Sequence, residues 1–370
     1  FMKLTSISGF ERLRYSRWPH HEPAAVPEDE PLWDAVKKHD ILFHHPFESF
    51  DPIVRLLQDA ASDPEVLAIK MTLYRTSGDS PVVRALEQAA EAGKQVTVLV
   101  EIKARFDEER NISWAERLER AGVIVIYGIA RLKVHAKAML IVRRERNGVR
   151  RYVHLGTGNY NDKTARLYTD VGLLTARTDL AYEAGLFFNA ITGYSAIPAF
   201  SRLVMAPVGM KSRLLQLIER ETLRAKSDLQ GRIFAKLNSL ADPEIIKALY
   251  AASQAGVEIM LNVRGICMLV PEVPGLSETI TVVSIVDRYL EHARLLYFHN
   301  GGAPEVYAGS ADWMPRNLER RVELMFPIDD EDARQRVIMI LKTAFADNTN
   351  AHVMTSDGSF LAPKRRKNEP

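Results

Sequence analysis

The chain has a single cysteine, Cys267, among its 370 residues, so it cannot form an internal disulfide. This is compatible with a reducing compartment and predicts a cytoplasmic location. No apolar run is long enough to span a bilayer and no stretch resembles a signal peptide, which leaves only peripheral membrane association open. A large net charge is also missing: 49 basic and 47 acidic residues give +2, which implies no general attraction to nucleic acid. Any basic function must therefore be local.

Apolar and polar residues follow an α/β pattern from residue 41 onward. Apolar runs that predict strands alternate with segments of helical periodicity, which favours mostly parallel sheets covered by helices. In the first half we expect strands at residues 66–73, 95–102 and 123–127, and helices at 49–61, 81–92 and 112–121. In the second half we expect strands at residues 232–237 and 257–263, and helices at 211–225, 243–255 and 329–345.

The second half repeats the order of the first. Residues 251–259 echo residues 89–96, and each echo contains a glycine, Gly93 or Gly256, where a helix is expected to end. We therefore place a boundary near residue 205, between two copies of one fold. The resulting division is a proline-rich connector at 1–40, a first domain at 41–205, a second domain at 206–348 and a C-terminal tail at 349–370 that includes a basic run at 364–367.

A histidine followed two residues later by a cation occurs twice on predicted strands. The first pair is His135 with Lys137, and the second is His292 with Arg294. Side chains alternate along a strand, so each histidine is expected to share a face with its cation. A single pair of this kind is typical of a solvated edge strand, whereas its repetition favours a functional site.

Each pair is followed by a turn of small residues that ends in a polar side chain, Asn159 or Asp312. Glycine lets the backbone approach an anion closely and the polar side chain can bind it, so Asn159 is a candidate cofactor-binding residue. An acid stands 11 residues after each turn: Asp170 (170 − 159) and Glu323 (323 − 312). These acids are candidates to hold the histidine rings and fix their tautomers across a cleft; their alternative role is in surface salt bridges.

Two copies of the fold that face each other would bring His135 and His292 to one cleft. There, one imidazole can attack a phosphorus atom while the other moves the proton of the leaving group, because histidine is neutral near pH 7 yet readily protonated. Lys137 and Arg294 would neutralise the transferred group. The pattern therefore indicates phosphoryl chemistry.

Further cations stand where strands are expected to end, which is where open α/β sheets bind ligands. They are Arg75, Lys103, Arg105 and Arg264. Arginine at such positions can clamp a phosphate bidentately. Tyr168, two residues before the acid of the first half, could stack on a nucleotide or pack in the core.

Five stretches resemble the polyphosphate kinases, a family of the phospholipase D superfamily. They are Ala-Ile-Lys-Met-Thr-Leu-Tyr-Arg at 68–75, Val-His-Ala-Lys at 134–137, His-Leu-Gly-Thr-Gly-Asn-Tyr-Asn at 154–161, Thr-Ala-Arg-Leu-Tyr-Thr-Asp at 164–170 and Ser-Ala-Asp-Trp-Met at 310–314. The similarity runs from about residue 4 to 350 and resembles the catalytic C-terminal half of the family. Phospholipases carry an aspartate five residues after the lysine; Val142 stands there, which favours the kinase branch.

The resemblance implies two tandem phospholipase-D-like α/β/α sandwich domains, with mixed, mostly parallel sheets related by pseudo-two-fold symmetry. It further implies a homo-oligomer that transfers the terminal phosphate of ATP reversibly to inorganic polyphosphate, with Mg²⁺ and through a phosphohistidine. His135 resembles the phosphorylated histidine and His292 the second essential one. Tyr168, Arg264 and His292 match nucleotide-contacting positions.

Arg75 and Arg105 match positions that the family associates with magnesium. A guanidinium has no lone pair to offer a metal, so we interpret both arginines as phosphate clamps beside a magnesium ion held by phosphate oxygens and water.

Two other functions stay open. A phospholipase-D-like phosphodiesterase or nuclease would use the same histidine on a diester and need no ATP. A polyphosphate-binding fragment would hold the polymer with its arginines but, without its N-terminal domains, would transfer nothing.

Overall fold

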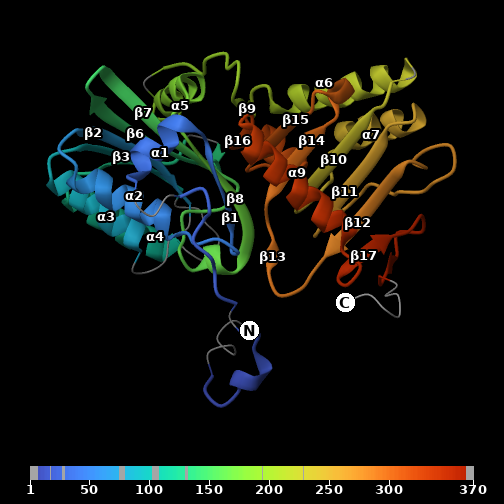
Figure 1. Cartoon of the computed structure of the whole chain (residues 1–370), viewed down its shortest axis with the longest axis horizontal. Coiled ribbons are helices and arrows are strands. Elements are labelled where there is room, and N and C mark those ends of the chain that lie inside the picture. The colour runs from blue at the N-terminus through green and yellow to red at the C-terminus, as the bar shows by residue number, and fades with distance from the viewer. Residues whose placement is uncertain are drawn as a thin grey trace.

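The chain forms two sheets that stand side by side, each with helices on its faces (Figure 1). The computed structural model describes residues 7–16, 18–26, 30–74, 80–101, 108–129, 132–193, 195–227 and 229–363, and only the backbone of residues 108–111. No helix in these ranges is both long and apolar enough to cross a membrane.

The first sheet has the strand order β1-β8-β7-β6-β2-β3-β4. Its strands are β1 (Ile41–His45), β2 (Val66–Leu73), β3 (Gln95–Val100), β4 (Ile124–Tyr127), β6 (Lys137–Glu145), β7 (Gly148–Gly156) and β8 (Tyr168–Thr175). Its helices are α1 (Leu32–Lys38), α2 (Asp51–Ser62), α3 (Pro81–Glu91), α4 (Glu108–Arg120) and α5 (Thr178–Ile191).

The second sheet has the order β18-β17-β12-β11-β10-β14-β15-β16, and β9 also pairs with β16. Its strands are β9 (Val204–Ala206), β10 (Arg232–Leu237), β11 (Glu258–Val263), β12 (Ile280–Ile285), β14 (Arg294–Phe298), β15 (Glu305–Gly309), β16 (Arg321–Pro327), β17 (Ala351–Met354) and β18 (Phe360–Leu361). Its helices are α6 (Met210–Lys226), α7 (Pro243–Gln254), α8 (Pro315–Glu319) and α9 (Glu331–Ala346).

The two sheets repeat one topology. The order β9-β16-β15-β14-β10-β11-β12 of the second sheet matches the order β1-β8-β7-β6-β2-β3-β4 of the first, strand for strand. The expected pair of α/β domains with mixed sheets is therefore confirmed. The expectation of mostly parallel sheets is wrong. Parallel pairing is confined to β2-β3-β4, β10-β11-β12 and two short strands at residues 133–134 and 290–291, and the other described strand pairs are antiparallel.

A shared apolar core joins the two domains. Phe187 of α5 and Val337 of α9 lie in the same cluster as Leu155 of the first sheet and Leu324 of the second. α9 lies between the two sheets in Figure 1. Separate clusters fill the outer faces, under α2, α3 and α4 on one side and under α6 and α7 on the other. The sheets are thus fixed to each other by burial, which holds the groups between them in place.

Equivalent helices of the two domains begin and end with the same local chemistry. Ser80 caps the N-terminus of α3 and Asp242 that of α7, and a proline follows each cap as the first helical residue. Gly93 and Gly256 follow the two helices with φ angles of +82° and +90°. Both glycines were expected to end helices, and a left-handed backbone that glycine adopts without strain confirms it.

Two segments outside the expected domains are structured. α1 lies within the expected connector, where Trp33 and Val36 join the core of the first domain. β17 and β18 lie within the expected tail, and β17 extends the second sheet by pairing with β12. These elements are too short for their periodicity to distinguish them from loops. The basic run at 364–367 lies outside the described residues.

Candidate active site

The first histidine lies where the chain passes from one sheet to the other. β5 (Lys133–Val134) pairs in parallel with β16 of the second domain, whereas the next strand, β6, belongs to the first sheet. Between them, the N–H groups of His135 and Ala136 donate to the carbonyl of Val322, at 2.8 and 3.0 Å. The continuous strand predicted through this histidine is therefore wrong, because the strand breaks at the crossing.

The second histidine repeats this crossing in the opposite direction. β13 (Leu290–Glu291) pairs in parallel with β8 of the first domain, and β14 then joins the second sheet. The N–H groups of His292 and Ala293 donate to the carbonyl of Thr169, at 3.2 and 2.8 Å. Each domain thus binds the histidine segment of the other, next to its own acid-bearing strand.

His135 is held by an acid of the opposite domain. Its Nδ1 lies 2.8 Å from Oε2 of Glu323, and the two side chains are 10% and 0% exposed. Ser310 and Asn317 donate hydrogen bonds to the same carboxylate, at 2.5 and 2.7 Å. Burial raises the pKa of Glu323 to about 7. Burial, reinforced by the charge of Lys137, lowers the pKa of His135 well below 6.5, so its ring is neutral.

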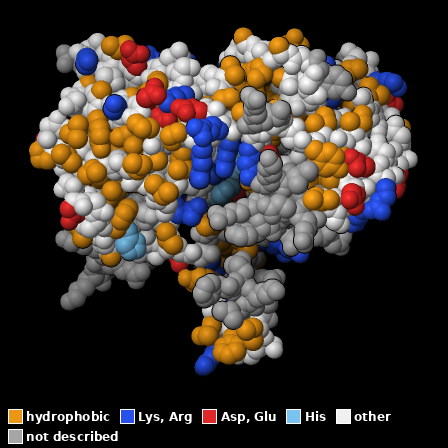
Figure 2. Space-filling model, turned by 180° about the vertical axis from the view of Figure 1, so that it is seen from behind, with side chains coloured by type: hydrophobic (Ala, Val, Ile, Leu, Met, Phe, Trp, Pro, Cys, Tyr) orange, Lys and Arg blue, Asp and Glu red, His pale blue; other side chains and the backbone are white. Residues whose placement is uncertain are grey.

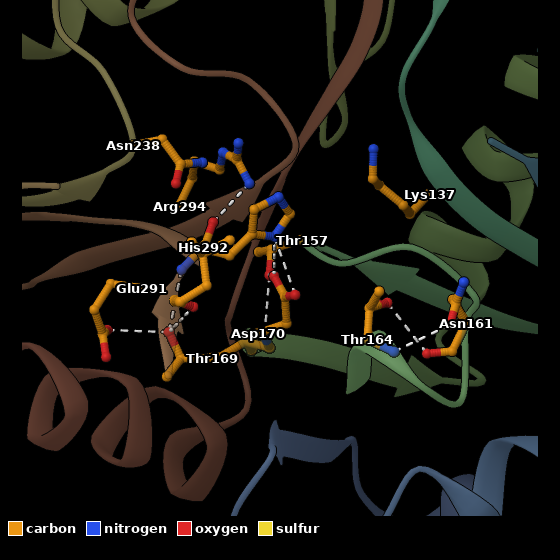
Figure 3. A network of polar contacts seen from close by, with 12 residues as sticks. Lys137, Thr157, Asn161, Thr164, Thr169, Asp170, Asn238, Glu291, His292 and Arg294 are labelled. Atoms are coloured by element: carbon orange, nitrogen blue, oxygen red, sulfur yellow. Dashed lines mark hydrogen bonds and ion pairs between the residues drawn. The ribbon is translucent and has the colours of Figure 1, made fainter. Parts of the chain in front are cut away.

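His292 is held in the same way by the acid of the first domain (Figure 3). Its Nδ1 lies 2.8 and 3.0 Å from the two carboxylate oxygens of Asp170, and Thr157 donates to this carboxylate at 2.6 Å. Burial alone would raise the pKa of Asp170, but His292 and Thr157 bring it below the ordinary value. Burial lowers the pKa of His292 and the charge of Asp170 opposes this shift.

Hydrogen bonding indicates which ring nitrogen carries the proton. Ser310 Oγ accepts the N–H of Leu324 at 3.1 Å, so the hydroxyl proton of Ser310 is donated to Glu323. In the same way, Thr157 Oγ1 accepts the N–H of Val171 at 3.0 Å and donates its hydroxyl proton to Asp170. Both carboxylates therefore act as acceptors, and the histidines donate from Nδ1. Each neutral ring then has its lone pair at Nε2, where it can react.

The two predicted cations are buried but held differently. Lys137 is 2% exposed and donates to the carbonyl of His135. Burial lowers its pKa to about 7. Arg294 is 4% exposed and donates to both carboxylate oxygens of Asp312, at 3.2 and 3.1 Å, and to the carbonyl of His292 at 2.6 Å. Figure 3 shows Lys137 on one side of the site and Arg294 on the other.

Sequence reasoning missed a further cation, Arg321. Its Nη1 lies 4.0 Å from Oε1 of Glu323, and its charge contributes to the lowered pKa of His135. It stands two residues before Glu323, as Tyr168 stands two residues before Asp170. The repeat that selected Tyr168 could therefore have found Arg321.

Two predicted nucleotide-contacting residues lie near the second histidine. The Tyr168 ring centroid lies 5.3 Å from that of His292. Arg264 donates to Oδ1 of Asn238, at 2.7 Å from Nη2, and to the carbonyl of Glu291 at 3.1 Å. Tyr168 of the first domain and Arg264 of the second thus both lie beside the segment that carries His292.

Of the other predicted ligand-binding residues, the structure describes Asn159 alone. Asn159 has a buried Oδ1 that finds no hydrogen-bond partner among the described residues. Arg75, Lys103 and Arg105 lie outside those residues. Within the described ranges, no group of three or more His, Cys, Asp or Glu side chains could hold a metal ion. The described side chains therefore offer no cluster that would hold magnesium without phosphate oxygens or water.

Gly158 of this turn lies directly against the side chain of Asp170. A Cβ at this position would lie 2.3 Å from Oδ2 and 2.5 Å from Cγ of Asp170. Asp170 is fixed from its other side by Thr157 and His292. The glycine therefore makes room for the acid that holds the histidine.

We expect Gly158→Ala to displace Asp170 and with it His292. Any reaction that uses His292 should then be slower by roughly 10²-fold, because a displacement of about 1 Å at a reacting group has this effect. Rates measured beside Gly185→Ala, whose new Cβ would meet only Arg151 Nε at 3.8 Å, would separate displacement from a general effect of the methyl group. Equal rates for both variants and the parent chain would contradict this role.

Positive charge gathers where the two halves meet. Figure 2 shows Lys and Arg side chains around a histidine at this junction. The structure thus combines two neutral, oriented imidazoles with buried cations, which suits an anionic substrate that carries a transferable group.

Two family models match the chain: Polyphosphate kinase C-terminal domain 1 over residues 31–197 and Polyphosphate kinase C-terminal domain 2 over residues 203–370. Polyphosphate kinase from Rhodopirellula baltica is 54% identical over 366 residues, which cover 99% of this chain and 43% of that protein. The enzyme of Halalkalibacterium halodurans is 53% identical over 98% of this chain and 52% of its own length. The chain thus spans about half the length of these relatives.

Solved structures agree with these matches. The crystal structure of polyphosphate kinase from Porphyromonas gingivalis superposes with a TM-score of 0.91 at 39% identity, over 99% of this chain and 56% of that one. Phosphatidylserine synthase from Haemophilus influenzae shares the fold, with a TM-score of 0.56 at 10% identity over 84% of this chain and 87% of that one. The chain belongs to the polyphosphate kinase family and comprises its two C-terminal domains.

Proposed function

We propose that this chain contains the phosphotransfer centre of a polyphosphate kinase, which transfers the terminal phosphate of ATP reversibly to inorganic polyphosphate through a phosphohistidine on His135. The observation that carries the proposal is the pair of acid–histidine contacts exchanged between the two domains, His135 with Glu323 and His292 with Asp170. A cytoplasmic location, which the single cysteine favours, and assembly into a homo-oligomer, which the family resemblance implies, belong to the same proposal.

His135 is the better nucleophile of the two histidines. Its lowered pKa keeps the ring neutral, and the Nδ1–H bond to Glu323 leaves the lone pair at Nε2. Nε2 attacks the terminal phosphorus of ATP, the bond from this phosphorus to the bridging oxygen breaks, and the electron pair leaves with ADP. Glu323 stabilises the positive charge that develops on the imidazole. In the second step, the terminal oxygen of polyphosphate attacks the same phosphorus and releases His135.

His292 is the better acid, because it lies against an ionised carboxylate. Burial lowers the pKa of His292, but the charge of Asp170 opposes this shift, and the phosphates of a bound substrate would oppose it further and favour the protonated ring. Protonated His292 can donate from Nε2 to the leaving oxygen while Nδ1 stays bonded to Asp170. The two rings thus take different roles because their environments shift their pKa values differently.

The cations divide the work of stabilising charge on the transferred group. Lys137 and Arg321 lie on the side of His135, and Arg294 is fixed beside His292 by Asp312. Because these charges are preorganised in a buried site, they cost little reorganisation when the transition state forms. Magnesium that accompanies ATP would be bound by phosphate oxygens, and no step above depends on it.

The reaction is expected to have a bell-shaped pH profile with its maximum near pH 7. Below about pH 7 Glu323 gains a proton and can no longer stabilise the charge on His135; above it Lys137 loses its proton and its positive charge. The profile of kcat/KM would show both limbs. Lys137→Arg should remove the alkaline limb, because arginine stays charged. A profile that is flat between about pH 6 and 8 would contradict this assignment.

Labelling tests the proposed function directly. The protein is incubated with γ-labelled ATP and Mg²⁺, and separately with labelled polyphosphate, and is then assayed for an acid-labile, base-stable phosphate. Label from both donors supports an autonomous phosphotransfer centre. Label from polyphosphate alone means that the chemistry is present but ATP binding needs the part of the family's length that this chain lacks. No label from either donor overturns the proposal, and cleavage of a diester without ATP would then favour a phosphodiesterase.

A further inference from the structure

A buried ion pair lies directly behind His292. Lys236 of β10 places Nζ 2.6 Å from Oε2 of Glu291, the residue before His292 in β13, and the two side chains are 3% and 17% exposed. A buried ion pair loses the solvation of both charges, so it is weak evidence for a stabilising role. Its position beside a reactive group points to another role.

The pair reaches across to the first domain through a threonine. The hydroxyl of Thr169 donates to Oε2 of Glu291 at 3.0 Å. Nζ of Lys236 lies 3.4 Å from the hydroxyl oxygen of Thr169. Thr169 Oγ1 in turn accepts the N–H of His292 at 3.2 Å (Figure 3). Thr169 is the neighbour of Asp170, which holds the ring of His292. One network therefore fixes both the backbone of the histidine and the strand that carries its acid.

The first half of the chain shows what the fold itself requires. Thr72 of β2 occupies the place of Lys236, one residue before the end of the equivalent strand, and it bonds the carbonyl of Ala136 at 2.8 Å. Val134, the counterpart of Glu291, has no charged side chain. Thr72 and Val134 cannot form an ion pair, so the Lys236–Glu291 pair has no counterpart at the equivalent positions of the first domain.

We propose that Glu291 is a positioning residue for His292 and that Lys236 compensates its charge. The carboxylate of Glu291 orients the hydroxyl of Thr169, which holds the backbone of His292 in the register that places Nδ1 against Asp170. This inference rests on the proposed function, in which His292 protonates the leaving oxygen. The ion pair is therefore expected to affect the rate of phosphate transfer more than the stability of the fold.

Two double variants separate positioning from charge. Lys236→Met with Glu291→Gln and Lys236→Met with Glu291→Leu both remove the two buried charges, but only the first keeps an oxygen that can accept the hydroxyl of Thr169. Phosphate is loaded on His135 from polyphosphate and chased with ADP. We expect a chase near the parent rate for the glutamine variant and about 10²-fold slower for the leucine variant.

A spectroscopic measurement reports on His292 without the reaction. The Nδ1–H signal in ¹⁵N-histidine-labelled protein should stay in place in the glutamine variant and shift in the leucine variant. Thr169→Val should reproduce the leucine result and replaces that variant if it does not fold. Lys211→Met, which removes an ion-paired lysine of α6, is the control and should change neither reading.

An unshifted Nδ1–H signal with a parent-like chase rate in folded leucine and valine variants would overturn the positioning role. If the parent protein takes no label at all, the proposed function fails, and the Nδ1–H signal still decides whether the network positions His292.

Discussion

Replacing His135 with alanine is expected to abolish covalent labelling from both ATP and polyphosphate. The substitution removes the Nε2 lone pair that lies opposite the bond to Glu323, and the other acid-bound imidazole, His292, is held by Asp170 instead. The loss should be complete within detection, because the covalent step has no nucleophile. Phosphate bound to the protein after separation in base measures the outcome.

A matched control uses a histidine outside the site. His352 on β17 is exposed and bonds only the backbone carbonyl of Asn350 in the described structure, so His352→Ala should label like the parent chain. Circular dichroism and thermal unfolding of both variants test whether loss of label comes from loss of fold. Undiminished label in folded His135→Ala would exclude this residue as the phosphorylated group.

Glu323→Gln is expected to slow formation of the phosphoenzyme by roughly 10³- to 10⁴-fold, the scale seen when the acid of an acid–histidine pair is made neutral. Glutamine keeps the shape of the side chain but not the negative charge that stabilises the phosphorylated ring. Asn317 donates to Oε1 of Glu323, so an amide nitrogen at that place would also meet a donor and disturb the ring orientation. Single-turnover labelling from polyphosphate measures the rate.

Asp170→Asn is the matched control, since it changes the equivalent acid on the other histidine. If His292 acts on the leaving oxygen, this variant should slow labelling from ATP and the chase with ADP in parallel, while the neutral state of His135 is kept. The ionisation of His135 can be followed by NMR in both variants. If Glu323→Gln and Asp170→Asn change it equally, the assignment of His135 as nucleophile and His292 as acid is contradicted.

Short-range patterns in the sequence selected histidines and acids that the structure brings into contact. The His-x-cation pairs and the acids that follow the two turns at equal distance needed only the repeat to be recognised, and the contacts of His135 with Glu323 and of His292 with Asp170 are present. The capped helices α3 and α7 were also predictable, because a cap and a proline act within one turn of the chain. The same repeat marks Arg321, which was missed because the residue type differs from Tyr168.

By itself, the sequence determined that two copies of one α/β fold each carry a histidine, a cation and an acid. The tertiary structure decided that the copies exchange their histidine segments, that the strands break at both histidines, and that Lys236 and Glu291 meet behind one of them. The acid and histidine of the two site pairs are 188 and 122 residues apart. Contacts of this range depend on which sheet edges pair and which faces are buried together, and no local propensity encodes that choice.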